Sequence, residues 1–131
     1  MAVRTTDEIE LYIPKLNKIL GFKENTHKWI AIRFLINFSL SIETPYNFTQ
    51  NEKPTLEYNL DQIVGKGKSE HDYYQYYFKM VESFENIRLK NENEFSRKLE
   101  YHIQRGFNLL KNSIRENTDI YNYILEEFKL I

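Results

Sequence analysis

The sequence contains no cysteine, so neither disulfide bonds nor thiolate metal sites are available to the protein. It also lacks a lipidation motif and an apolar run of the roughly 20 residues that a membrane span needs. The opening residues, MAVRTTDEIELY, are too polar for a secretory signal peptide. Neither sign of charge is in excess, because 18 Lys and Arg stand against 19 Asp and Glu for a net charge of -1. We therefore expect one domain spanning residues 1–131, cytoplasmic, with no membrane contact and no nucleic-acid signature in its composition.

Recognisable catalytic arrangements are missing too. The triplet at residues 70–72 (EHD) places three titratable groups together, but neighbours on a helix point in different directions. The segment 65–68 (GKGK) precedes Ser69, yet position 62, where a nucleotide-binding P-loop has its first glycine, holds Gln62. We therefore expect that the protein is not an enzyme and that it has no catalytic residue, metal or cofactor.

What the sequence does have is a helix that is apolar on nearly every side. Its apolar positions are Trp29, Ile30, Ala31, Ile32, Phe34, Leu35, Ile36, Phe38, Leu40 and Ile42. Such a helix is buried in a core or packed against another subunit, and Pro45 marks its end. Because so short a chain has difficulty covering all its sides, we predict that a second copy of the protein covers part of this helix.

The segments before and after the central helix are less regular. Residues 1–5 form an arm or a brief strand, and Thr5 with Glu8 has capping-box spacing for a helix over residues 5–21. Pro14 predicts a kink in that helix; the alternative makes residues 9–13 a strand and Pro14 the first residue of the helix. Residues 46–68 are predicted to form a long loop with one helical turn near residues 60–64.

Periodic apolar positions return in the second half of the chain. Ser69 is predicted to cap a helix whose apolar face includes Tyr77 and Val81, and residues 91–93 break it. The next helix runs over residues 94–114, where Gly106 predicts close approach by a neighbouring helix. A last helix occupies residues 115–131. The predicted fold is mostly α, a compact multi-helix domain around a buried central helix.

Lysines gather in two stretches, and in both they have the reach to contact DNA phosphates. The predicted contacts are Lys15, Lys18, Lys23, Lys28, Lys66 and Lys68. A solvated surface explains the same residues equally well. Arg105 is predicted either to hold a carboxylate or phosphate in its fork or to form a structural ion pair, and His102, on the apolar face, is predicted to be a core histidine.

In order and spacing these segments resemble the DndE family, a component of bacterial DNA phosphorothioation systems. The resemblance covers residues 5–112 and includes the helix pair 5–21 and 26–42. The individual residues that match the family pattern are predicted to have structural or interface roles. They are Arg33, Glu57, Asn59, Gly65, His102, Arg105 and Gly106. The loop between Val64 and Ser69 is extended relative to that pattern by its Gly-Lys repeat.

The resemblance implies a small helical protein with a ribbon-helix-helix-like N-terminal helix pair that assembles into a homotetramer. It implies binding to double-stranded DNA, with a preference for nicked duplex, beside the cysteine desulfurase, sulfur-transfer and ATPase-like proteins of the system. We therefore expect a non-catalytic subunit that binds DNA backbone and docks the modification enzymes. The alternatives are a ribbon-helix-helix-type transcriptional regulator or antitoxin, and an assembly adaptor without DNA contact.

Overall fold

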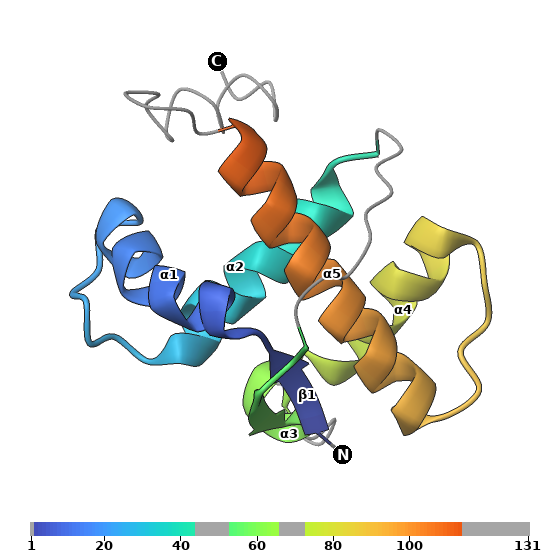
Figure 1. Ribbon diagram of the computed structural model, residues 1–131. Helices are drawn as coiled ribbons and strands as arrows, with labels where there is room; N and C mark the ends of the chain where they lie inside the picture. Colours follow the sequence, from blue (N-terminus) through green and yellow to red (C-terminus); the bar gives the residue numbers. More distant parts are fainter. Residues whose placement is uncertain (1, 44–52, 66–72, 114–131) are drawn as a thin grey trace.

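The computed structural model describes residues 2–43, 53–65 and 73–113 of the chain, and this part is mostly helical (Figure 1). Its elements in order are β1 (Ala2–Thr5), α1 (Asp7–Ile19), α2 (Lys28–Ser41), β2 (Leu56–Asn59), α3 (Leu60–Val64), α4 (Tyr74–Glu85) and α5 (Glu92–Ser113). The long helix α5 crosses α2, with α1 on one side of this pair and α4 on the other. In the described part of the chain, no helix is long and apolar enough to cross a membrane.

The core forms where α2 and α5 cross. A Cβ atom added to Gly106 of α5 would lie 2.0 Å from the main-chain oxygen of Leu35 in α2. The predicted close approach at Gly106 is therefore confirmed, because a larger residue there meets the backbone of α2. Around the crossing, the fully buried apolar side chains include Ile32, Leu35, Ile36, Phe95, Leu99 and Ile103.

The chain covers most of α2 by itself, and cover of the remaining part by a second copy stays a prediction. Phe38 is 1% exposed and Leu40 7%, while Trp29 at the other end remains 38% exposed. The long helix α5 and the flanking helices α1, α3 and α4 supply most of its cover. Burial of α2 therefore does not require oligomerisation.

Helix α1 begins one residue later than the capping box predicted. Thr6, not Thr5, is the N-cap, and its side chain accepts a hydrogen bond from the Ile9 nitrogen at 3.4 Å. Thr5 belongs to β1 and donates to Glu10. The helix continues through Pro14, so the alternative in which residues 9–13 form a strand is wrong.

Strand β1 pairs with β2, which the sequence analysis placed inside a loop. The strands are antiparallel, with Val3 opposite Tyr58. The other edge of β1 is closed by side chains of α5: Arg97 donates to the Ala2 oxygen at 2.7 Å, and Glu100 accepts from the Arg4 nitrogen at 2.7 Å. This edge of β1 therefore does not present free main-chain groups to the same strand of a second copy, as a ribbon-helix-helix dimer requires.

The remaining boundaries differ modestly from prediction. The helical turn expected near residues 60–64 is present as α3, which Asn59 caps together with Gln62. Helix α5 starts at Glu92, because Asn91, expected to break a helix, caps this one by accepting from the Glu94 nitrogen. Residues 46–52 and 66–68 of the predicted loop, the Ser69 cap, residues 70–72 and the C-terminal helix 115–131 lie outside the described residues.

Candidate functional site

Four of the predicted DNA contacts are exposed side chains along α1, the turn that follows it and the first residue of α2; they are Lys15, Lys18, Lys23 and Lys28. Lys18 forms an ion pair with Glu24 at 3.3 Å, and both side chains remain largely exposed. Such a pair is weak and screened by salt, so it leaves Lys18 able to turn toward a phosphate. Lys66 and Lys68 lie outside the residues that the structure describes.

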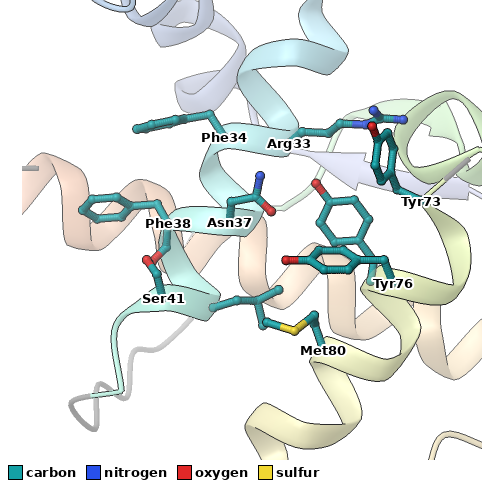
Figure 2. Close-up of a pocket in the computed structure, with 10 residues that line it drawn as sticks. Arg33, Phe34, Asn37, Phe38, Ser41, Tyr73, Tyr76 and Met80 are labelled. Carbon is teal, nitrogen blue, oxygen red and sulfur yellow. The ribbon is translucent and has the colours of Figure 1, made fainter. Parts of the chain in front are cut away.

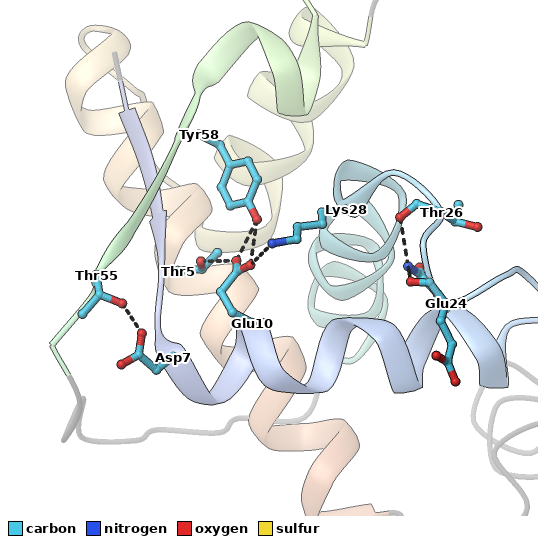
Figure 3. A network of polar contacts seen from close by, with 9 residues as sticks. Thr5, Asp7, Glu10, Glu24, Thr26, Lys28, Thr55 and Tyr58 are labelled. Atoms are coloured by element: carbon cyan, nitrogen blue, oxygen red, sulfur yellow. Dashed lines mark hydrogen bonds and ion pairs between the residues drawn. The ribbon is translucent and has the colours of Figure 1, made fainter.

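Lys28 lies in a network of polar side chains, which Figure 3 shows. Its Nζ donates to the carboxylate of Glu10 at 2.9 Å. The same carboxylate accepts from Thr5 at 2.6 Å and from the Tyr58 hydroxyl at 2.7 Å. Burial, followed by the hydrogen bond to Glu10, raises the pKa of Tyr58 above its ordinary value. Lys28 thus ties α2 to α1, β1 and β2, and this structural contact competes with any contact to DNA.

Among these lysines, Lys15 and Lys23 are the most available for contact with DNA. Within the described ranges neither has a carboxylate partner, and the Lys15 Nζ lies 5.8 Å from the centre of the Tyr12 ring. Nearby, Lys111 of α5 bonds to Glu8 of α1. The positive surface therefore consists mainly of Lys15, Lys18 and Lys23, interrupted by acidic partners.

The motif histidine is the core residue that the sequence predicted. His102 is fully buried, and its Nε2 donates to the carboxylate of Glu85 at 3.0 Å. Its Nδ1 lies 2.7 Å from the Ser39 hydroxyl, which in turn accepts from Arg105 at 3.0 Å. Because a carboxylate only accepts, Nε2 is the donor to Glu85, and Nδ1 is left to pair with the Ser39 hydroxyl. The chain of four side chains links α4, α5 and α2.

Glu85 stays ionised at the end of this chain. Burial opposes its ionisation, but the hydrogen bonds from His102 and from Lys98, at 2.8 Å, outweigh burial and lower its pKa below the ordinary value. An ionised carboxylate paired on both oxygens is a structural anchor here. Within the described residues, Oε1 pairs with Lys98 and Oε2 with His102.

Arg105 is also structural. It is 2% exposed and donates to the main-chain oxygens of Ser39 at 2.5 Å and Ile42 at 3.0 Å, where α2 ends. A guanidinium at the C-terminal end of a helix satisfies carbonyls that have no partner within the helix. The hypothesis that Arg105 holds a phosphate is therefore wrong, because the side chain is enclosed beneath Phe84.

The other motif positions shape the ends of short elements. Asn59 caps α3, and Gly65 ends it with a φ of 88°, a conformation that favours glycine. Glu57 is exposed on β2, opposite Arg4. These residues therefore lie at element boundaries and on the surface, and they do not converge on one site.

The sequence analysis missed a groove between α2 and the start of α4, drawn in Figure 2. It has a volume of about 640 Å³, and its lining includes Phe34, Asn37, Phe38, Tyr73, Tyr76 and Met80. Arg33 lies at one end of the groove, with its guanidinium carbon 4.7 Å from the centre of the Trp29 ring and 5.2 Å from that of Tyr73. One indication of this groove was present in the sequence. Tyr73, which precedes α4, and Tyr76 within it are aromatic residues outside the buried face of the helix.

The described residues hold no group of three or more His, Asp or Glu side chains arranged to bind a metal ion. Fold and site together define a mostly helical domain whose motif residues cap and join its helices. The family model described as "DNA sulphur modification protein DndE" matches residues 2–118 of the 131-residue chain. The chain therefore belongs to the DndE family, which confirms the resemblance found in the sequence. Comparison with curated proteins and with solved structures found no match to this chain.

Proposed function

We propose that the protein is a non-catalytic subunit of a bacterial DNA phosphorothioation system that binds the DNA backbone and docks the modification enzymes. The match of the DndE family model to residues 2–118 carries this proposal. In the proposal the protein works in the cytoplasm as a homotetramer, on double-stranded and preferentially nicked DNA. Its protein partners are the sulfur-transfer and ATPase-like subunits of the system.

The exposed lysines on α1 and after it support the contact with DNA. Lys15, Lys18 and Lys23 are exposed, and a phosphate can displace Glu24 from Lys18 because their ion pair is open to solvent. Contacts of this kind position a protein on DNA without reading its sequence. Three lysines on one chain bind weakly, and several copies in one assembly multiply the effect.

Exposed apolar side chains support the contacts with protein. Leu11 of α1 is 83% exposed. It borders a depression of about 340 Å³ that Tyr12 and Phe107 also line. An exposed apolar residue beside such a depression suits contact with another chain. This surface, which borders the proposed DNA contact at Lys15, is suited to contact with a second copy or an enzyme partner.

The test measures binding to a duplex at two salt concentrations, with a double variant, Lys15→Glu with Lys18→Glu. Affinity of the wild-type protein should be independent of sequence, and log K should fall by about 0.9 per phosphate contact for each tenfold rise in salt. The double variant should bind more weakly and with a shallower salt dependence. Binding that is indifferent to salt, or equal in the double variant, would contradict the proposal.

Lys90→Glu is the matched control for these charge changes. Lys90 is exposed in the loop between α4 and α5, and this loop lies on the opposite side of the molecule from α1 (Figure 1). This variant changes the net charge by the same amount per residue without touching the proposed surface. It should bind DNA as the wild type does.

An assembly adaptor without DNA contact is the second candidate. The observation that favours it is that Lys18 and Lys28 already have acidic partners, in a chain of net charge -1. Under this alternative, the lysine variants co-purify with the partner enzymes and support modification as the wild type does. A transcriptional regulator of the ribbon-helix-helix type is disfavoured, because Arg97 and Glu100 occupy the edge of β1.

A further inference from the structure

The groove between α2 and α4 has a lining suited to a flat ring with polar edges. Tyr73 and Tyr76 are 45% and 55% exposed. Figure 2 places them across the groove from Phe34, with Asn37 between the two sides. Aromatic side chains exposed in this way offer faces on which another ring can stack. Asn37 hydrogen-bonds to the Tyr77 side chain, and the rest of its amide can meet the edge of such a ring.

The one charged residue among those described as lining the groove is Arg33. Its Nε donates to the main-chain oxygen of Ile63, and its guanidinium is held against the rings of Trp29 and Tyr73. These contacts fix the side chain, and within the described residues both Nη nitrogens have no acceptor. A fixed cation with free donors at the end of an aromatic groove suits a phosphate group.

We propose that this groove binds an unpaired nucleobase of single-stranded DNA. The base stacks on Tyr76 and faces Phe34, its edge meets Asn37, and an adjoining phosphate meets Arg33. Single-stranded DNA is bound in this way elsewhere, by aromatic side chains beside a positive groove. The inference rests on the proposed contact with DNA but assigns a separate surface, away from Lys15 and Lys18.

A protein segment is the competing occupant, and the lining disfavours it. An apolar side chain in the groove would bury the free donors of Arg33 without partners, together with the part of the Asn37 amide that does not bond to Tyr77, which is costly. A nucleotide satisfies both groups and also covers the rings. The volume, about 640 Å³, lies within the range of small-ligand sites, roughly 300–1,000 Å³.

The experiment measures binding of the full chain to a labelled oligo-dT strand and to an intact duplex by fluorescence anisotropy. Tyr76→Ala should weaken binding to oligo-dT by about tenfold, the usual size of one lost stacking contact, and leave duplex binding unchanged. Tyr76→Phe keeps the ring and should bind as the wild type does. Ile87→Ala, which removes an exposed apolar side chain at 37% exposure outside the groove, is the control.

A second readout comes from Trp29, the single tryptophan of the chain. Because Arg33 lies against its ring, oligo-dT in the groove should change its fluorescence, and Tyr76→Ala should reduce that change. Equal oligo-dT affinity in the wild type and Tyr76→Ala would overturn the inference. So would an absence of oligo-dT binding combined with Tyr76-dependent capture of a partner enzyme, which would make the groove a protein site.

The two proposals fail separately. If Lys15→Glu with Lys18→Glu leaves duplex binding unchanged while Tyr76→Ala weakens oligo-dT binding, the lysine surface is wrong and the groove stands. If the lysine variant weakens duplex binding while Tyr76→Ala changes nothing, the groove assignment is wrong and the backbone contact stands.

Discussion

The main-chain oxygen of Leu35 occupies the place where a side chain at position 106 would begin. A Cβ atom there would lie 2.0 Å from that oxygen and 2.8 Å from the carbonyl carbon. Both atoms belong to the backbone of α2, so neither moves without shifting the helix. The contact between α2 and α5 is therefore set by the absence of a side chain at Gly106.

Gly106→Ala should destabilise the protein. In an open helix this change stabilises by up to about 1 kcal/mol. Here it forces two helices apart, and we expect a net loss of about 1–3 kcal/mol. Urea unfolding followed by circular dichroism measures it. Asn93→Ala, an exposed change on the same helix, should stay within about 0.5 kcal/mol; equal stability of Gly106→Ala and wild type would contradict the close packing.

Ser39→Ala should cost about 1–3 kcal/mol, because the hydroxyl shares a hydrogen bond with His102 Nδ1 and accepts from Arg105, and its loss leaves buried groups unpaired. Ser41→Ala is a matched control on the same helix, since Ser41 is exposed and bonds only to the Phe38 oxygen among its described contacts. The measurement is the free energy of unfolding of both variants. Similar losses of unfolding free energy in the two variants would show that the buried hydrogen bonds of Ser39 stabilise the protein no more than the hydrogen bond of the exposed Ser41.

Glu85→Gln should make the protein less sensitive to acid. The folded protein lowers the pKa of Glu85 below its ordinary 4.5, so the carboxylate contributes stability above the unfolded pKa. That contribution is lost as the pH falls through the lower, folded pKa. The variant, without this group, should lose less stability between pH 7 and pH 3 than the wild type, as measured by thermal unfolding across that range. An unchanged pH profile would contradict the ion pairing of Glu85.

Pro14→Ala should stabilise α1. Pro14 is exposed inside a continuous helix and supplies no N–H for the hydrogen bond of its turn. Restoring that bond outweighs the added freedom of the unfolded chain, for a net gain of about 1–2 kcal/mol. Thermal unfolding checks this, with Lys15→Ala as the neighbouring control. A loss of stability would show that the proline ring makes a packing contact of its own.

Helical periodicity predicted the long helices because their buried faces repeat along the sequence. Phe95, Leu99, Ile103 and Leu110 line one side of α5 as expected, and all are buried. Gly106 on the same side predicted the close crossing. The helices that build the core were therefore accessible from the sequence.

Strand β2 could not be predicted from the sequence in the same way. Three of its four residues are exposed, so it has no alternating apolar pattern, and its pairing with β1 is a contact across more than 50 positions. The choice between Thr5 and Thr6 as the cap also depends on tertiary structure, because Thr5 is drawn into β1 and bonds to Glu10. The spacing of residues along the sequence predicts neither the pairing of β2 with β1 nor the choice of Thr6 as the cap.

The lysines were identifiable, but their partners were not. Sequence spacing does not show that Glu10, eighteen positions before Lys28, receives its ammonium group. The groove could not be predicted for the same reason, since Phe34 and Tyr76 come from helices joined by a long connection. Both features arise from the placement of α2 against its neighbours.

The hydrogen bonds between Arg4 and Glu100 join residues 96 positions apart. During synthesis, β1 leaves the ribosome early and cannot complete its contacts until α5 has followed. Until then its outer edge and the apolar face of α2 lack their cover, as in other folds that depend on distant contacts. Chains that end before α5 should therefore aggregate or be degraded, so the folding of the first part of the protein depends on α5.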